Sequence, residues 1–99
     1  MTQTQYSAPL HVAHDHPSLP GHFPGEPIVP GVLLLEYVAL ALRAWRGQRL
    51  TRVPEAKFLA PLLPGEVAEI ALTDANGRVR FEIRRDSDVL ARGLIEGAA

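Results

Sequence analysis

The most restrictive feature of this 99-residue chain is an apolar run from Val32 to Leu42 that only Glu36 interrupts. Leucine and alanine make up most of the run, and both residues favour a helix. A helix that is apolar around its whole circumference has to be buried on all sides. The rest of the chain must therefore supply a layer that wraps around this segment.

The ends of this helix can be read from the flanking residues. Pro30 suits a helix start, and Gly47 suits a helix stop. Arg43 and Arg46 stand where the negative end of the helix dipole favours cations. The pattern predicts a helix over residues 31–46. A membrane-spanning helix needs about 20 apolar residues, so this run is too short to be one.

A segment rich in proline and glycine precedes the helix. Five prolines stand within residues 17–30 and three glycines within residues 21–31. Proline fixes the backbone angle φ and removes a hydrogen-bond donor, whereas glycine permits unusual angles. We expect a stiff, wound loop that is neither a helix nor a central strand.

The second half of the chain has the period-two pattern of strands. Apolar residues alternate with polar ones around Ile70 and again around Phe81, and Asn76-Gly77 between them is typical of a tight hairpin turn. A second turn is expected at Asp86-Ser87. The last strand is expected to have a mostly small inner face that lets the sheet approach the helix closely. The residues of that face are Val89, Ala91, Gly93 and Ile95.

Two further strands complete the expected fold. One is predicted near residues 52–60, ended by Pro61 and Pro64-Gly65, and another near residues 7–12. The order is strand, loop, helix and then about four antiparallel strands. This order predicts an α+β fold in which a sheet of about five strands curls around one long central helix. At this length, residues 1–99 are expected to form a single domain.

Three candidate groups for chemistry fall within sixteen residues. His22 is a potential base held in the proline-braced loop. Glu36 is a carboxylate in an otherwise apolar helix, so it should form a pair, be protonated or line a cavity. Gly31 can present a free backbone N–H at the helix start, where negative charge is favoured. A base, an acid and an oxyanion donor are therefore expected to lie near one another.

The string Gly-His-Phe-Pro-Gly-Glu-Pro-Ile-Val-Pro-Gly-Val-Leu-Leu-Leu-Glu, from Gly21 to Glu36, closely resembles the signature of the 3-hydroxyacyl-(acyl carrier protein) dehydratases. Lys57-Phe58, Pro61 and Pro64-Gly65 are also similar to that family. The resemblance implies the hot-dog fold. The compact N-terminal part, with Asp15-His16-Pro17, is most similar to short dehydratase-like proteins of aryl-polyene and xanthomonadin pigment clusters. This leaves open whether the acyl chain is saturated, aryl or polyene.

The resemblance also implies a reaction and a set of roles. His22 would act as the base at C2, Glu36 would protonate the departing 3-hydroxyl, and the Gly31 N–H would hold the thioester carbonyl. The product would be a trans-2-enoyl thioester, and no cofactor is implied beyond the phosphopantetheine arm of the acyl carrier protein that bears the substrate. In this family the histidine and the acid come from opposite subunits, which implies a dimer with an identical or homologous chain.

Self-association is also expected from the residues themselves. A sheet of about five short strands can cover only part of the apolar helix, and the chain is near the lower limit for an independent core. A second chain could extend the sheet edge to edge and cover the open flank of the helix.

Composition excludes several other classes of protein. There is no cysteine, so disulfide frameworks, zinc fingers and thiol nucleophiles are ruled out. Ten basic and eleven acidic residues give a net charge of −1, which provides no general attraction for nucleic acid or anionic membranes. The N-terminal residues lack the pattern of a signal peptide, so a cytoplasmic protein is expected.

Several alternatives remain open from the sequence. His11, His14 and His16 could suggest a metal, but surface or structural histidines are favoured and no metal site is predicted. The basic run of Arg43, Arg46, Arg49 and Arg52 is expected to compensate the helix dipole on a solvated surface, or to dock an acidic acyl carrier protein. His22 and Glu36 could be purely structural. The whole chain could also be a non-catalytic partner subunit or a hot-dog acyl thioesterase.

Overall fold

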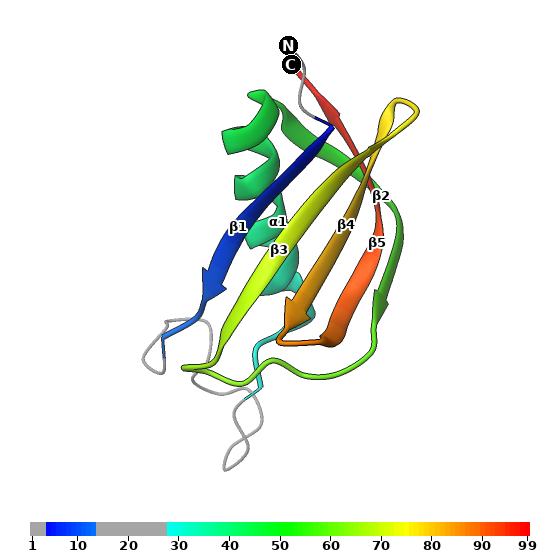
Figure 1. Ribbon diagram of the computed structural model, residues 1–99. Coiled ribbons are helices and arrows are strands. Elements are labelled where there is room, and N and C mark those ends of the chain that lie inside the picture. Colours follow the sequence, from blue (N-terminus) through cyan, green and yellow to red (C-terminus); the bar gives the residue numbers. More distant parts are fainter. Residues whose placement is uncertain (1–3, 14–27) are drawn as a thin grey trace.

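The computed structural model describes residues 4–13 and 28–99, and these residues form one helix and five strands. The elements are β1 (Gln5–His11), α1 (Gly31–Arg46), β2 (Arg49–Phe58), β3 (Val67–Ala75), β4 (Arg78–Arg85) and β5 (Asp88–Ala98). The strands form one sheet in the order β1-β3-β4-β5-β2, and every neighbouring pair is antiparallel. Helix α1 lies across one face of this sheet (Figure 1). The predicted α+β arrangement is confirmed.

Helix α1 has the predicted bounds, and its two ends are formed as the flanking residues indicate. Gly47 adopts a left-handed conformation with φ of 65°, and its N–H donates to the Arg43 carbonyl at 2.8 Å. Only a residue that tolerates positive φ can make this stop without strain. At the other end Pro30 is extended, and its carbonyl accepts hydrogen bonds from the N–H groups of Leu33 and Leu34.

The two predicted turns are present and explain the register of the three central strands. Asn76 and Gly77 both have positive φ, 52° and 86°, which matches the right-handed twist of a two-residue hairpin. Asp86 also has a positive φ, 54°, in the turn between β4 and β5. Both turns use residue types that tolerate this region of backbone conformation.

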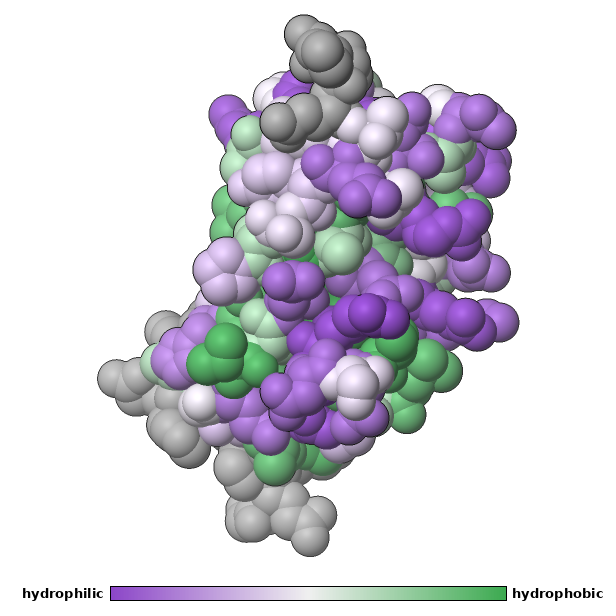
Figure 2. All heavy atoms as spheres, viewed as in Figure 1, coloured by the Kyte–Doolittle hydropathy of each residue, from purple (hydrophilic) through white to green (hydrophobic). Residues whose placement is uncertain are grey.

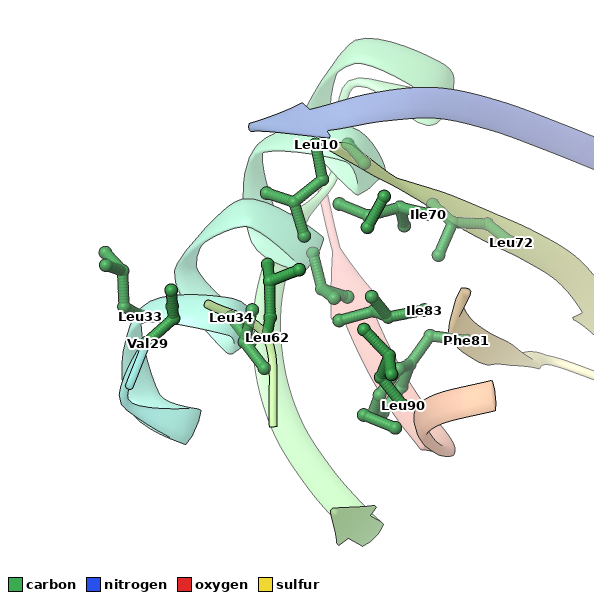
Figure 3. Packing of buried hydrophobic residues seen from close by; sticks show 14 of the residues in the cluster. Leu10, Val29, Leu33, Leu34, Leu62, Ile70, Leu72, Phe81, Ile83 and Leu90 are labelled. Carbon is green, nitrogen blue, oxygen red and sulfur yellow. The ribbon is translucent and has the colours of Figure 1, made fainter. Parts of the chain in front are cut away.

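The core lies between α1 and the inner face of the sheet. The predicted alternation on β3 and β4 places Ile70 and Phe81 inside, both at most 2% exposed. Figure 3 shows the side chains of Leu34 and Leu62 next to each other near the start of the helix, with the sheet residues beyond them. The buried helix residues are Leu33, Leu34, Val38, Ala41 and Leu42. One continuous apolar cluster therefore joins the helix to the sheet.

The outward face of the sheet is mostly polar, with a few apolar residues, as Figure 2 shows. Arg78 donates to a Glu96 carboxylate oxygen at 2.9 Å, and Arg52 lies 3.8 Å from the other oxygen. Arg84 pairs with Glu82 on the same strand. Since the arginines of these pairs are about half exposed or more, the ion pairs contribute little stability and mainly keep this face hydrated.

Strand β5 departs from the predicted inner face at its beginning. Ile83 pairs with Ala91 and Arg84 pairs with Val89, so Leu90 is an extra residue in β5. This β-bulge turns Leu90 into the core beside Ala91, while Val89 is only half-buried. The prediction for Val89 was wrong because a strict period of two cannot anticipate an inserted residue.

The small residues of β5 also have a different partner from the one expected. A Cβ atom added at Gly93 would lie 2.0 Å from the Glu55 carbonyl oxygen of β2 and 2.8 Å from the Phe81 ring. Gly93 therefore permits close pairing of β2, not close approach of the helix. Gly97 is the position where the helix comes near, because an added Cβ would lie 2.8 Å from Leu42 Cδ2.

The helix is not buried on all sides within one chain. Val32 is 69% exposed and Leu40 is 63% exposed, and Glu36 between them is exposed as well. The sheet is a single layer and reaches only one side of α1. The expectation of complete burial is therefore wrong for the isolated chain, whereas partial cover by the sheet is what the size of the chain led us to expect.

The two edge strands have slightly different bounds from those predicted. Strand β2 begins at Arg49, three residues earlier than expected, and β1 spans residues 5–11. The pairing of β2 with β5 shifts register on both sides of Arg52, close to Pro54. Proline is tolerated here because it removes a donor from an edge strand.

In the two described stretches, no helix is both long and apolar enough to cross a membrane.

Replacing Gly93 with alanine tests how closely β2 is packed. Because the added Cβ would overlap a backbone carbonyl, Gly93→Ala should lower the free energy of unfolding by about 3 kcal/mol. Gly47→Ala is a matched control, since no atom lies within 4 Å of its added Cβ and only the positive φ opposes it, at about 1 kcal/mol. Urea unfolding of both variants measures the difference. Equal losses would contradict the close pairing of β2.

Candidate active site at the start of helix α1

An apolar groove of about 570 Å³ lies where α1 begins and β2 ends. Its lining residues come from the segment before the helix, the first turns of α1 and the chain after β2. They are Ile28, Val29, Pro30, Gly31, Leu34, Phe58, Leu59, Ala60, Pro61 and Leu62. Phe58 and Leu59 are about half exposed. The groove can therefore accommodate an apolar group that enters from solvent.

Gly31 is packed directly under the ring of Phe58. A Cβ atom added at Gly31 would lie 2.9 Å from Cζ of Phe58 and 3.1 Å from its Cε1. Any side chain at position 31 would force the ring to move. Glycine thus lets the backbone of the helix start form part of the groove wall.

The N-terminus of α1 presents backbone N–H groups beside this groove. No side chain among the described residues caps the helix, and the hydrogen bonds to Pro30 begin at Leu33. Within the described part of the chain, the N–H groups of Gly31 and Val32 have no acceptor. Such groups carry the positive end of the helix dipole and can bind an oxygen with developing negative charge.

The chain between β2 and β3, here called the 59–66 loop, connects this helix start to the rest of the fold. Leu62 is fully buried, and its carbonyl accepts a hydrogen bond from the Val29 N–H at 2.9 Å. The Gly65 N–H donates to the Val12 carbonyl at 2.8 Å. The N–H groups of Leu59 and Ala60 both donate to the Leu90 carbonyl at the bulge. The loop therefore links β1, β5 and the segment that precedes α1.

Two charged side chains brace the 59–66 loop from within. One Glu66 carboxylate oxygen accepts hydrogen bonds from the Leu63 N–H and from Arg85 Nη1, each at 2.8 Å. The same Arg85 nitrogen donates to the Pro61 carbonyl at 3.2 Å. The hydrogen bond from the Leu63 backbone, together with the nearby Arg85 guanidinium, lowers the pKa of Glu66 below its ordinary value of 4.5.

Glu36, the predicted acid, lies away from this groove. Val32, Glu36 and Leu40 are four residues apart and form one exposed stripe along α1. Glu36 is not among the residues that line the groove at Gly31. The structure of one chain therefore does not bring these two predicted site residues together.

The predicted base cannot be placed, because His22 lies outside the described residues. The same holds for His14 and His16 of the histidine group. His11 is described and is exposed at the end of β1. Within residues 4–13 and 28–99, no three His, Cys, Asp or Glu side chains gather in a way that could hold a metal ion.

The basic run at the end of the helix divides into engaged and exposed residues. The Arg46 guanidinium lies 3.9 Å from the Trp45 ring centroid and 3.3 Å from an Asp74 carboxylate oxygen, so it fastens α1 to β3. Arg43 and Arg49 are exposed and form no ion pair in the described part of the structure. Those two remain accessible to a partner.

Sequence reasoning did not anticipate the roles of Phe58, Glu66 and Arg85 around the helix start. Phe58 stood in the string that resembles the family, but nothing in the sequence indicated that its ring covers Gly31. Arg85 is one of several arginines in an alternating strand, and its neighbour Arg84 looks the same in sequence. Only the fold distinguishes them, because Arg85 turns toward the 59–66 loop.

A single helix laid across a five-stranded antiparallel sheet is the architecture of the hot-dog fold. Comparison with known families agrees with this class. The family model described as ApeI-like, ApeI dehydratase, matches residues 1–94. The chain belongs to the ApeI-like dehydratase family.

Curated relatives carry the name 3-hydroxyacyl-(acyl-carrier-protein) dehydratase FabZ. The protein of Haemophilus influenzae strain Rd is 39% identical over 69 residues, which cover 60% of this chain and 47% of that protein. The protein of Chlamydia trachomatis serovar L2 is 36% identical over 102 aligned residues, which cover 87% of this chain and 67% of the relative. The chain thus spans about half the length of the Haemophilus protein.

Solved structures share the fold. A chain of the dehydratase heterocomplex ApeI:P from Xenorhabdus doucetiae matches with a TM-score of 0.85 at 22% identity, covering 98% of this chain and 89% of that one. An uncharacterized protein from Erwinia carotovora matches at 0.75 and 25% identity, covering 95% and 82%. An acyl-CoA hydrolase from Staphylococcus aureus matches at 0.67 and 17% identity, covering 96% and 62%. The predicted hot-dog fold is confirmed.

The lowered pKa of Glu66 predicts how stability depends on pH. Its carboxylate is favoured in the folded chain, so its contribution is present above about pH 4.5 and is lost as the pH falls through the lower, folded pKa. Glu66→Gln should therefore lower the melting temperature at pH 7, and the difference from the wild type should shrink by pH 3. Glu69→Gln, at an exposed carboxylate without an ion pair among the described residues, is the control and should show no such trend. A Glu66→Gln difference that is equal at both pH values would contradict this role.

Proposed function

We propose that this protein is a dehydratase that eliminates water from a 3-hydroxyacyl thioester carried on acyl carrier protein. In this reaction a base removes the proton at C2, and the C3 hydroxyl leaves with a proton from an acid as water. The product is a trans-2-enoyl thioester. No redox cofactor is required, because no electrons are transferred to or from the substrate.

The observation that supports this proposal most directly is the uncapped start of α1 at an apolar groove. The proton at C2 is only weakly acidic, so negative charge that develops on the thioester oxygen has to be stabilised as the proton leaves. The Gly31 N–H has no acceptor among residues 4–13 and 28–99, and the groove beside it suits an acyl chain. Membership of the ApeI-like dehydratase family supports the same reaction.

The proposed base is His22, and the proposed acid is Glu36, fourteen positions later in the sequence. A histidine near neutral pH is often enough unprotonated to accept the C2 proton. Glu36 is exposed in one chain and does not line the groove at Gly31. An acid on that outer stripe is placed to serve the groove and the His22 of a second chain.

We infer that the second chain adds to the edge of the sheet at β2 and covers the stripe of Val32, Glu36 and Leu40. Exposed apolar residues on β2 and on α1 support this arrangement, since proteins that act as monomers rarely expose contiguous apolar surfaces or an open sheet edge. The partner is a second copy or a homologous subunit. The similar Xenorhabdus chain belongs to a heterocomplex, which keeps the second alternative open.

Acyl carrier protein is the proposed source of the substrate, held on its phosphopantetheine arm. Arg43 and Arg49 are exposed at the end of α1 and could attract its acidic surface, whereas Arg46 is already engaged with Trp45 and Asp74. This role would place the protein in the cytoplasm. Fatty-acid and polyene-pigment synthesis are both compatible with the site.

Hydration of a crotonyl thioester, the reverse reaction, tests the activity. The pure protein should consume the conjugated double bond, measured by ultraviolet absorbance, without added metal or nucleotide. Chelator should have no effect, and no free thiol should appear. Thiol release would indicate a thioesterase instead, and an inactive protein that activates a homologue would indicate a non-catalytic subunit.

His22→Ala should lower turnover by about 10²- to 10⁴-fold. Glu36→Gln should lower turnover as well, without loss of stability, because glutamine keeps the size and hydrogen bonding of the side chain but has no proton to give.

Mixing the two inactive variants tests whether the site is shared. A hybrid of His22→Ala with Glu36→Gln contains one site in which both residues are native. Under conditions that allow subunits to exchange, part of the activity should therefore return. Two separately labelled chains, followed by fluorescence energy transfer, provide the control for exchange. Proven exchange with no recovery would show that each site is built within one chain.

A further inference from the structure

We propose that Arg85 is a positioning residue that holds the N-terminus of α1, and with it the Gly31 N–H, in place for the thioester oxygen. This inference rests on the proposed function, because it assigns Gly31 the role of oxyanion donor. Arg85 itself does not line the groove and would not touch the substrate. Its action would pass through the 59–66 loop.

Arg85 is the last residue of β4, and its side chain points into the junction between the strands and the 59–66 loop. Its Nη1 donates to the Pro61 carbonyl at 3.2 Å and to the Glu66 carboxylate at 2.8 Å. The side chain is only 26% exposed. A guanidinium suits this place because it can donate to several acceptors at once in a fixed plane.

A backbone hydrogen bond connects the 59–66 loop to the segment that precedes α1. Leu62, which follows Pro61, accepts a hydrogen bond from the Val29 N–H at 2.9 Å and is fully buried. Val29 is itself 3% exposed and lies two residues before Gly31. Pro30 between them has a restricted φ, so a shift of Val29 is passed on to the helix start.

Few hydrogen bonds hold the helix start among the described residues, although the buried side chains of Leu33 and Leu34 anchor the first turn of α1 in the core. Pro30 has no side chain that could cap α1, and the first backbone hydrogen bonds begin at Leu33. The atoms nearest to a Cβ added at Gly31 all belong to the ring of Phe58, a side chain that can move. The backbone just before Gly31 is held by the hydrogen bond between Val29 and Leu62, and Arg85 and Glu66 hold the loop that carries Leu62.

Arg84 provides a matched control on the same strand. It is adjacent to Arg85, is exposed on the polar face and pairs only with Glu82 among the described residues. Arg84→Met and Arg85→Met remove the same groups from opposite faces of β4. Only Arg85→Met removes the contacts with Pro61 and Glu66.

The first measurement is steady-state hydration of a small crotonyl thioester, well below the unfolding temperature of each variant. Arg85→Met should lower kcat by about 10- to 100-fold, because a small displacement of a group in the site has a large effect on rate. KM should stay near the wild-type value, since the apolar groove is kept. Arg84→Met should match the wild type, and Arg85→Lys should recover part of kcat because it keeps a charged donor. An unchanged kcat, or a rise in KM alone, would overturn the inference.

The second measurement does not depend on activity. The backbone amide signals of Val29 and Gly31 in nuclear magnetic resonance spectra should shift in Arg85→Met, the Val29 amide should exchange its hydrogen faster, and Arg84→Met should leave both unchanged. If these amides do not respond, Arg85 does not hold the helix start and the inference is wrong. If they respond as expected but the wild type hydrates no thioester, the proposed function fails while the hold of Arg85 on Gly31 is supported.

Discussion

The fold depends on burying one very apolar helix against one face of a single sheet. Helix α1 contributes five buried residues to a cluster that includes residues from β1, β3, β4 and β5. Burial of this much apolar surface is the main term that favours folding of so small a chain. Because the sheet is one layer thick, it covers only the inner side of the helix. Val32 and Leu40 on the outer side remain in solvent.

The site follows from the position of that helix. The start of α1 meets the end of β2 and the 59–66 loop, and an apolar groove forms at this junction. Gly31 can stand under Phe58 only because it has no side chain. Backbone N–H groups of the loop donate to the carbonyls of Val12 and Leu90, and the Val29 N–H donates to the loop at Leu62. Arg85 and Glu66 hold its interior. The polar elements of the proposed chemistry are thus supported by a rigid, mostly apolar frame.

One chain carries the proposed oxyanion donor and the proposed acid on different sides of the same helix. The groove and the Gly31 N–H lie at one place, and Glu36 lies on the exposed stripe. The open edge at β2 and that stripe are the surfaces a second chain would cover. The sheet covers only one side of α1. This one fact explains both the exposed apolar stripe on the helix and the separation of Glu36 from the groove at Gly31.

The sequence by itself determined much of this protein. The helix bounds followed from Pro30 and Gly47, the hairpin turns from Asn76-Gly77 and Asp86, and the resemblance pointed to the family, because these are local signals of backbone angle and residue type. Only the tertiary structure decided the bulge at Leu90, the contact of Gly93 with β2, which residues of α1 stay exposed and the distinct position of Arg85. Each of these depends on which distant segments meet, and residue spacing along one strand or helix carries no information about that.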